Sequence, residues 1–492
     1  MNRKAPAPIA MLPTGVPGLD DVLGGGLPEY SFNVIAGEPG SGKTTMAHQI
    51  MFSNSTPERC ALYFTVLGEP PIKMLRYQQQ FSFFDPDKLD GAIRFVNLSQ
   101  EVMEQDLGVV LDRIVREVEE TSPGVVVVDS FRSVARAAQT IPRGELELQS
   151  FLQCLAIHLT GWQATTFLVG EYTDVETRDN PVFTVADGVL RLSQSVDRNS
   201  IVRKLQVVKS RGQSPMPGLH TVRITGDGVQ VFPRIVASVE ESARETPRGR
   251  VSTGVPELDE MLGGGIPMGD SVLIAGPSGS GKSVLASQFI AAGAERNEPG
   301  VLIVFEEHPK EYLHRAQALG FDLDGMVRRH MLSVIYLRPL DLSPDETLYE
   351  IRESANRVRA KRVVIDSMSG FELALAPTFR EDFRESLYRL VGSLTGAGIT
   401  VLTTMEIVQI GTGLRFTPNV VSFLADDIIL QRYVEMEGQL RKILTVVKMR
   451  GSQHSKDFRA YEIGPGGLVI GEALRAYQDI LSGAPRLREN HQ

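Results

Sequence analysis

The chain has 492 residues, of which 42% are hydrophobic and 23% charged, and its formal net charge is −9. This length and composition predict several globular domains with large cores and exclude a disordered chain. The acidic balance argues against a broad basic surface for nucleic acid, and no apolar run approaches the roughly 18 residues of a membrane span. Cys60 and Cys154 lie far apart without metal-ligand spacing, so we expect two reduced core cysteines in a cytoplasmic protein.

A phosphate-binding loop lies near the start of the chain. Residues 32–44 read FNVIAGEPGSGKT, in which an apolar run is followed by G-x-x-x-x-G-K-[ST] and then by a helical pattern. Glycines let backbone N–H groups turn towards phosphate oxygens, and a helix N-terminus favours an anion. We expect Lys43 to reach the β- and γ-phosphates of ATP and Thr44 to hold Mg²⁺. The predicted ATP-binding residues are Gly37, Gly40, Ser41, Gly42, Lys43, Thr44 and Thr45.

The same loop appears again in the second half. Residues 272–283 read VLIAGPSGSGKS, and Lys282 follows Lys43 by 239 residues (282 − 43). TGVPGLDDVLGGGLP at 14–28 matches TGVPELDEMLGGGIP at 253–267 with the same offset. The repeating unit is therefore a whole domain rather than a short structural repeat. The second predicted ATP-binding set is Gly276, Gly279, Ser280, Gly281, Lys282, Ser283 and Val284.

The repeat predicts two α/β domains. The expected boundaries are 1–235 for the N-terminal domain, 236–249 for a polar linker, 250–475 for the C-terminal domain and 476–492 for a short tail. Apolar, β-branched runs alternate with amphipathic stretches, at 32–37, 60–66, 124–130 and 164–170, and then at 271–276, 300–306, 362–367 and 399–405. Runs that are apolar on both faces predict a mostly parallel central sheet between helices. We expect antiparallel hairpins at 201–209 and 440–448 to close the two sheets.

An acidic residue ends one buried-strand pattern in each domain. Asp129 follows Val125–Val128, and Asp366 follows Val363–Ile365. Opposite the hydroxyl of a phosphate-binding loop, such an aspartate would hold Mg²⁺ directly or through water. An ordinary aspartate that caps a turn is the alternative. The predicted metal-binding residues are Thr44, Asp129, Ser283 and Asp366.

Two further patterns predict catalytic residues. Glu306 and Glu307 are adjacent carboxylates at the end of a predicted strand, where they could position and deprotonate an attacking water or hydroxyl. Solvated acids at the start of a loop are the alternative. A K-x-R-G motif recurs after the last long strand of each domain and could act as arginine fingers do on a neighbour's γ-phosphate, or could be surface charge at a strand edge. Its cations are Lys209, Arg211, Lys448 and Arg450.

Together these motifs resemble the KaiC family within the RecA-superfamily ATPases. The resemblance covers nearly the whole chain and is carried by the LDxxLGGGxP lead-in, both P-loops, the two aspartates, FEEHP at 305–309 and, most specifically, residues 426–454. It implies two tandem RecA-like P-loop NTPase domains in a double-ring homohexamer. It further implies ATP and Mg²⁺ bound at subunit interfaces, with the K-x-R-G cations acting across them. The first domain would be a slow ATPase that drives assembly, and the second would transfer phosphate to hydroxyls of an adjacent subunit, with the paired glutamates as base.

The chain departs from the family pattern in three respects. Leu67 and Gly68 stand where the second domain has its glutamate pair, and Glu69, one residue later, could substitute only with a shifted backbone. Pro215 stands where the second domain has His454, a further predicted ATP-site residue. The N-terminal domain is therefore expected mainly to bind nucleotide. The serine acceptor of the family falls on Ser422, with Thr417 as a weaker candidate, and the threonine acceptor falls on Phe423, which has no nucleophilic oxygen. The tail is shorter than the family's partner-binding tail, so regulation by an unidentified protein partner would differ.

Two other functions compete with a KaiC-like ATPase. One is a nucleotide-gated scaffold that signals to a protein partner with negligible catalysis. The other is a DNA-repair ATPase, which needs basic or aromatic loops facing a pore; Arg132, Arg136 and Arg143 offer such charges, but the matching second-domain loop is acidic, and we do not expect nucleic-acid binding. We expect Glu117, Glu119 and Glu120 to form a solvated helix face and Trp162 to pack in the core.

Overall fold

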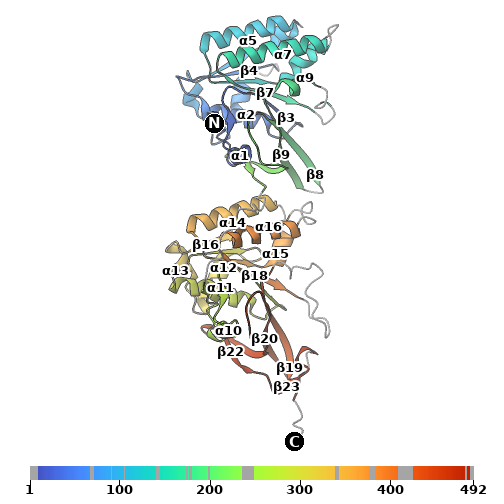
Figure 1. The fold of residues 1–492 in the computed structure, drawn as a ribbon. Helices are drawn as coiled ribbons and strands as arrows, with labels where there is room; N and C mark the ends of the chain where they lie inside the picture. Colours follow the sequence, from blue (N-terminus) through green and yellow to red (C-terminus); the bar gives the residue numbers. More distant parts are fainter. Residues whose placement is uncertain are drawn as a thin grey trace, which may run out of the picture. The chain divides into compact units, whose positions relative to one another are not determined.

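In the computed structural model of the protein, the described residues are 9–66, 71–89, 91–104, 106–139, 144–172, 176, 180–197, 200–234, 249–337, 343–375, 383–407, 425–482 and 485–487. The chain divides into two compact units, Met1–Arg234 and Ile235–Gln492 (Figure 1). Each unit is an α/β domain built on its own nine-stranded sheet, which confirms the predicted fold class. None of the helices in the described ranges is long and apolar enough to span a bilayer.

The N-terminal sheet has the strand order β11-β10-β9-β8-β3-β7-β6-β4-β5. The strands are β3 (Phe32–Gly37), β4 (Ala61–Thr65), β5 (Ile93–Asn97), β6 (Val125–Asp129), β7 (Thr165–Glu171), β8 (Gly188–Asp197), β9 (Ser200–Ser210), β10 (His220–Thr225) and β11 (Gly228–Phe232). From β8 to β5 the neighbours run parallel, and β9, β10 and β11 add antiparallel hairpins. The predicted parallel sheet and the closing hairpin are confirmed. A short pair, β1 (Met11–Leu12) and β2 (Leu27–Pro28), precedes the sheet.

Helices cover both faces of this sheet because its central strands are apolar on both sides. In β3, Val34 packs into the cluster formed with α5 and α7, whereas Ile35 packs into the cluster formed with α1 and α2. Figure 1 shows these two helical layers on opposite sides of the strands. The helices are α1 (Leu19–Leu23), α2 (Lys43–Asn54), α3 (Pro71–Gln78), η1 (Pro86–Leu89), α4 (Ser99–Met103), α5 (Leu107–Thr121), α6 (Phe131–Gln139), α7 (Gly144–Gly161) and α9 (Pro181–Val185).

The C-terminal sheet repeats this topology in the order β16-β15-β17-β18-β14-β19-β20-β21-β22. The strands are β14 (Ser271–Gly276), β15 (Gly300–Val304), β16 (Leu332–Tyr336), β17 (Arg362–Asp366), β18 (Thr400–Glu406), β19 (Asp427–Met436), β20 (Gln439–Met449), β21 (Arg459–Gly464) and β22 (Gly467–Ala473). Smaller pieces are β12 (Arg250–Val251), β13 (Ile266–Pro267), β23 (Tyr477–Gln478), η5 (Ile480–Ser482) and β24 (Arg486–Leu487).

One helical layer of the C-terminal unit packs on the face of β14 that carries Val272 and Ile274. It consists of α10 (Pro256–Met261), α11 (Lys282–Glu295), α12 (Pro309–Ala318) and α13 (Leu323–Arg328). The opposite layer consists of α14 (Pro344–Val358), α15 (Met368–Ala374) and α16 (Phe383–Gly396) (Figure 1). Both sheets therefore present the carboxyl ends of their parallel strands at one edge, where ligands of such folds bind.

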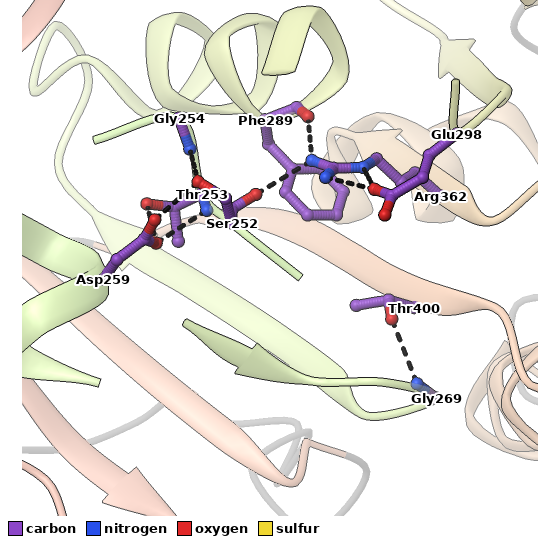
Figure 2. Close-up of polar contacts among 9 residues, drawn as sticks. All are labelled: Ser252, Thr253, Gly254, Asp259, Gly269, Phe289, Glu298, Arg362 and Thr400. Carbon is purple, nitrogen blue, oxygen red and sulfur yellow. Dashed lines mark hydrogen bonds and ion pairs between the residues drawn. The ribbon is translucent and has the colours of Figure 1, made fainter. Parts of the chain in front are cut away.

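The lead-in motif has a structural role in both domains. Asp259 accepts hydrogen bonds from Thr253 N and Oγ1, each at 2.7 Å, and Figure 2 shows this pairing. Thr14 makes the same two bonds to Asp20 at 2.9 and 2.7 Å. The aspartate satisfies backbone and hydroxyl donors of a turn that would otherwise be buried unpaired.

A buried arginine adds a second anchor in the C-terminal domain. Arg362 is 0% exposed and donates to Glu298 Oε2 from both Nε (2.9 Å) and Nη2 (2.5 Å). Its Nη1 donates to the carbonyls of Ser252 and Phe289, and its guanidinium lies 4.7 Å from the Phe289 ring centroid (Figure 2). Arg362 thus ties β17 to α11 and to the lead-in segment.

Three expectations about packing were wrong. Glu119 and Glu120 are exposed as expected, but Glu117 is 2% exposed, because Arg94 and Arg113 each pair with its carboxylate at 2.8 Å and make its burial tolerable. Trp162 is 41% exposed at the end of α7 instead of lying in the core. Cys60 and Cys154 are free cysteines, as expected, but both are half-buried and not in the core.

Candidate active sites at the two phosphate-binding loops

Both phosphate-binding loops have the backbone that their glycines predict. Gly40 and Gly42 have φ of +75° and +101°, and Gly279 and Gly281 have φ of +75° and +98°. Glycine adopts these left-handed conformations at no steric cost, whereas other residues are strained there. Each loop then leads directly into a helix that begins at its lysine, so unpaired helical N–H groups face the space where phosphates would bind.

The N-terminal loop opens onto a cavity of about 420 Å³. Lys43 Nζ donates to the Glu38 carbonyl at 2.7 Å, so the ammonium is held by its own loop. Burial lowers the pKa of Lys43, while Glu171 and then Asp129 oppose this shift by their charges. The cavity is lined by Gly40, Gly42, Lys43, Thr44, Thr45, Asp129, Ser130, Arg132, Ser133, Arg136, Gly170, Glu171 and Ile224.

Asp129 sits at the centre of a buried hydrogen-bond network in this cavity. Thr44 Oγ1 donates to Asp129 Oδ2 at 2.7 Å, and Tyr63 Oη donates to the same oxygen at 2.9 Å. Burial raises the pKa of Asp129, and these two hydrogen bonds oppose the rise. Behind Tyr63, the His48 ring stacks at 4.6 Å, and burial lowers the pKa of His48 to about 4, which keeps the imidazole neutral. Tyr63 and His48 therefore fix the carboxylate without adding charge.

The C-terminal loop opens onto a cavity of about 480 Å³. Lys282 Nζ donates to the carbonyls of Gly276 (3.0 Å) and Pro277 (2.8 Å), and burial lowers its pKa against the opposing charges of Glu406, Asp366 and Glu306. The cavity is lined by Ser278, Gly279, Gly281, Lys282, Ser283, Val284, Val304, Glu306, Glu307, Tyr312, Arg315, Asp366, Ser367, Glu406 and Ile463.

The two adjacent glutamates of this cavity differ in their partners. Glu306 Oε1 accepts a hydrogen bond from Ser367 Oγ at 2.8 Å, a neutral donor that orients the carboxylate and leaves its charge in place. Glu307 Oε2 lies 2.5 Å from Arg315 Nη2 and is therefore neutralised by an ion pair. Of the two, Glu306 has the features of a base that acts beside Lys282 and Asp366.

Both cavities contain oxygen ligands that suit Mg²⁺. The 2.7 Å contact between Thr44 and Asp129 brings a hydroxyl and a carboxylate oxygen together, and Ser283 and Asp366 line the second cavity in the same roles. Asp366 Oδ1 is also oriented by Thr404 Oγ1 at 2.5 Å. Mg²⁺ usually binds through one or two such groups, with substrate phosphates and water as the other ligands, so these residues fit the ion.

The K-x-R-G cations lie at the other end of the sheet from the loops of their own domain. Arg450 Nη1 is 3.2 Å from Asp426 Oδ1, and the other oxygen of Asp426 accepts from Ser271 N, at the first residue of β14. The phosphate-binding loop follows Gly276, the last residue of that strand, five residue steps of about 3.3 Å or roughly 17 Å away. Lys448 Nζ donates to the Ala425 carbonyl at 2.6 Å at the same end.

The N-terminal domain repeats this arrangement. Arg211 Nη1 lies 3.0 Å from Asp187 Oδ1, and Asp187 Oδ2 accepts from Phe32 N, at the start of β3. Lys209 Nζ donates to the carbonyls of Phe183 and Thr184. None of these four cations lines the cavity of its own domain among the described residues.

Several other predicted residues lie behind the cavities or outside the described chain. Gly37 and Gly276 end β3 and β14, and the hydroxyls of Ser41 and Ser280 bond to Glu38 O and Gln431 Oε1, so these four support the loops without lining the cavities. His454 Nδ1 lies 2.9 Å from the Ser455 carbonyl, away from the cavity. The predicted acceptors Ser422 and Thr417 lie outside the described residues, as do Leu67, Gly68, Phe423 and Arg143.

The cavities also contain charged residues that the motifs did not identify. Glu171 and Glu406 end β7 and β18, the strands that lie directly beside β3 and β14, and so reach the phosphate-binding loops. Arg132 and Arg136, which the sequence offered only as charges for the disfavoured DNA-binding alternative, line the N-terminal cavity. For Glu171 and Glu406, the only sequence signal was an acid at the end of an apolar run. This signal identifies a cavity residue only once the strand order is known.

Comparisons with known proteins agree with this geometry. The model of the KaiC ATPase family matches residues 12–235 and again residues 251–475. The circadian clock oscillator protein KaiC of Picosynechococcus sp. is 28% identical over 98% of this chain and 94% of its own length. KaiC of Synechococcus elongatus is 28% identical over 98% and 93%, and KaiC 1 of Synechocystis sp. is 29% identical over 96% and 91%.

Proposed function

The chain belongs to the KaiC family of ATPases, and we propose that it works as a double-ring homohexamer whose C-terminal site hydrolyses ATP and phosphorylates a serine of the adjacent subunit. The observation that supports this most directly is Glu306, a carboxylate oriented by Ser367 in the same cavity as Lys282, Ser283 and Asp366. A base, a phosphate-binding lysine and a pair of magnesium ligands are the parts that phosphoryl transfer from ATP requires.

In the proposed reaction, Glu306 takes the proton of an attacking water or serine hydroxyl. The attacking oxygen then bonds to the γ-phosphorus as the bond to the β–γ bridging oxygen breaks, and ADP leaves with that electron pair. Lys282 would neutralise charge on the β- and γ-phosphates. Bound Mg²⁺, held through Ser283 and Asp366, would supply further charge neutralisation at the phosphate oxygens. Ser422 is the proposed acceptor and Thr417 the weaker alternative, both supported by their place in the sequence.

A ring assembly is supported by the position of the K-x-R-G cations. Lys448 and Arg450 are held roughly 17 Å from their own phosphate-binding loop, too far for their side chains to reach a phosphate bound there. A neighbouring subunit would bring such cations to the γ-phosphate, as arginine fingers are brought in trans. We propose the same trans role for Lys209 and Arg211, and with it a cytoplasmic hexamer held together by nucleotide at its interfaces. His454 would serve the C-terminal interface.

For the N-terminal domain we propose ATP and Mg²⁺ binding that drives assembly, with slow or no hydrolysis. Its loop, Thr44 and Asp129 support binding, whereas the sequence has Leu67 and Gly68 in place of a glutamate pair. We also propose that the boundaries 1–235, 236–249, 250–475 and 476–492 describe the functional domains, linker and tail.

The test is the intact mass of the purified protein before and after incubation with Mg-ATP, alongside gel filtration. We expect a gain of one phosphoryl group that is absent in Lys282→Ala and Ser422→Ala, and a nucleotide-dependent shift from small species to a hexamer. Phosphate release without a mass gain would restrict the C-terminal site to hydrolysis. A chain that stays monomeric with Mg-ATP would contradict the ring.

A nucleotide-gated scaffold for an unidentified protein partner is the second candidate, favoured by the missing glutamate pair of the N-terminal domain. Tight ATP binding without product, in both the intact protein and the Glu306→Gln variant, would support it. A DNA-repair role loses its main argument, because Arg132 and Arg136 line the nucleotide cavity.

A further inference from the structure

The two nucleotide cavities carry opposite charge. Among the described residues, the N-terminal cavity is lined by three cations, Lys43, Arg132 and Arg136, and by two acids, Asp129 and Glu171. The C-terminal cavity is lined by two cations and four acids: Lys282, Arg315, Glu306, Glu307, Asp366 and Glu406. The lining of the N-terminal cavity therefore has one more cation than acids, although Glu176 pairs with Arg132 from outside the lining, whereas the C-terminal lining has two more acids than cations.

The two arginines lie on α6, and the matching helix of the other domain, α15, has no cation at the corresponding positions. Counted from Asp129 and Asp366, Arg132 corresponds to Ser369 and Arg136 to Leu373. Within α6 the two arginines are four residues apart, a spacing that puts them on the same helix face, and both line the cavity. The charge difference between the cavities therefore comes from the arginines of this helix together with the glutamate pair of the other cavity, and not from the phosphate-binding loops.

Arg132 lines the cavity and holds its guanidinium at the end of β7. Its Nη1 donates to the Glu171 carbonyl at 2.5 Å, at the end of β7, and its Nη2 lies 2.7 Å from Glu176 Oε1. In the parallel register Glu171 is opposite Gly37, from which the phosphate-binding loop starts. The guanidinium thus crosses from the helix after β6 to the strand beside the loop.

Arg136 is an exposed side chain at the mouth of the same cavity, and no hydrogen bond or ion pair engages it among the described residues. A guanidinium offers a planar fork of donors that matches phosphate oxygens and stays charged at all physiological pH values. An arginine without a protein partner can engage an anion without first breaking an ion pair.

On the basis of the ATP binding proposed above for the N-terminal domain, we propose that Arg132 and Arg136 bind the γ-phosphate from within the same subunit. They make this cavity a site that retains ATP and discriminates against ADP. ADP lacks the phosphate that would reach the end of β7, so it gains little from either arginine. In the absence of a glutamate pair, added positive charge strengthens binding without supplying a base, and the nucleotide stays unhydrolysed in place.

The competing explanation is that Arg132 only anchors the end of β7 and that Arg136 is a solvated surface charge. The two explanations differ in nucleotide preference. Loss of an anchor weakens ATP and ADP binding alike, whereas loss of a γ-phosphate contact weakens ATP binding alone.

The test uses the full-length protein with Lys282→Ala, so that binding reports the N-terminal site, and titrates fluorescent ATP and ADP analogues. We expect ATP to bind at least tenfold more tightly than ADP. Arg132→Ala and Arg136→Ala should each weaken ATP about tenfold or more and change ADP less than about threefold, since a charge-assisted hydrogen bond contributes roughly a tenfold effect or more. Arg116→Ala removes an exposed arginine of α5 that does not line the cavity and should change neither affinity.

Arg132→Lys keeps the charge and should restore part of the ATP preference, which separates charge from misfolding. Equal loss of ATP and ADP binding in both alanine variants, or no loss in either, would overturn the role of the arginines and leave ATP binding by this domain intact. If the Lys282→Ala protein binds neither nucleotide and an added Lys43→Ala changes nothing, the proposed ATP binding fails as well.

Discussion

The two glutamates of the C-terminal cavity should have very different effects when each is changed to glutamine. Glu306 is held by the neutral hydroxyl of Ser367, so its charge is available to accept a proton. Glu307 Oε2 is 2.5 Å from Arg315 Nη2, so this oxygen is already engaged by a cation. Glutamine keeps the shape of either side chain and the hydrogen bond from Ser367, but it cannot act as a base.

The expected magnitude follows from these roles. A positioned general base contributes about 10²- to 10⁴-fold to a rate, so Glu306→Gln should lower kcat by at least about 100-fold. The pair of Glu307 with Arg315 is half exposed on the arginine side, and such pairs contribute about 0–1 kcal/mol, so Glu307→Gln should lower kcat by less than about tenfold. Neither change should alter the KM for ATP more than about threefold, because Lys282 and the loop are intact.

The assay is steady-state phosphate release, with the rate of the Lys282→Ala variant subtracted as the contribution of the N-terminal site. Glu353→Gln, an exposed acid of α14 that does not line the cavity, is the matched control and should keep the wild-type rate. A Glu307→Gln variant as slow as Glu306→Gln, or a Glu306→Gln variant with more than a third of the wild-type rate, would refute the assignment of Glu306 as the base.

Three further predictions follow from single contacts. Asp426→Asn should release Arg450 and lower kcat about as much as Arg450→Ala does, with the KM unchanged. Steady-state kinetics of the two single variants and of the double variant check this. Because both changes act through one contact, their effects on kcat should not add in the double variant. Arg362→Ala should destabilise the C-terminal domain by about 3–5 kcal/mol, because it leaves Glu298 and two carbonyls without their buried partner, whereas Arg328→Ala, at an exposed ion pair, should cost less than about 1 kcal/mol. Scanning calorimetry measures both, and the fluorescence of Trp162, the only tryptophan, should report an unchanged N-terminal domain. Burial, followed by the charge of Asp270, raises the pKa of Asp427 to about 7, so the folded state keeps a proton that the unfolded state releases near pH 4. The free energy of unfolding should therefore fall as pH rises from about 4 to 7 and then level off. Denaturant titrations at a series of pH values measure this fall, and Asp427→Asn should reduce it.

The features that could be predicted from the sequence are those encoded by neighbouring residues. The P-loops follow from the order of an apolar strand, four loop residues, Gly-Lys-Thr or Gly-Lys-Ser, and a helix, and both form as expected. The parallel strands follow from their apolar runs. The internal repeat, visible as a constant offset of 239 residues between Lys43 and Lys282, predicts two domains of the same kind.

The features that could not be predicted depend on which strands become neighbours. Glu117 looks like one of several surface acids until Arg94 of the edge strand β5 packs beside its helix. Arg132 lies near the nucleotide cavity only because β7 separates β6 from β3 in the sheet, and this order cannot be read from the chain. The missed residues Glu171 and Glu406 depend on the same order. Local motifs therefore predict the phosphate contacts, whereas sheet order decides the remaining charge of each cavity.

The two domains have kept their shared scaffold and diverged in the charges around the γ-phosphate. The scaffold contacts recur in matching form: the lead-in aspartate on its threonine, and the aspartate that joins the K-x-R-G arginine to the first residue of the P-loop strand. The divergent positions all lie at the carboxyl end of the strands, where Glu306 and Glu307 stand in one cavity and Arg132 and Arg136 in the other. Acids there favour removal of a proton from a nucleophile, and arginines favour retention of the anion. The same fold can therefore present paired acids at the cavity of one domain and two arginines at the cavity of the other, with no change in how its sheet is built.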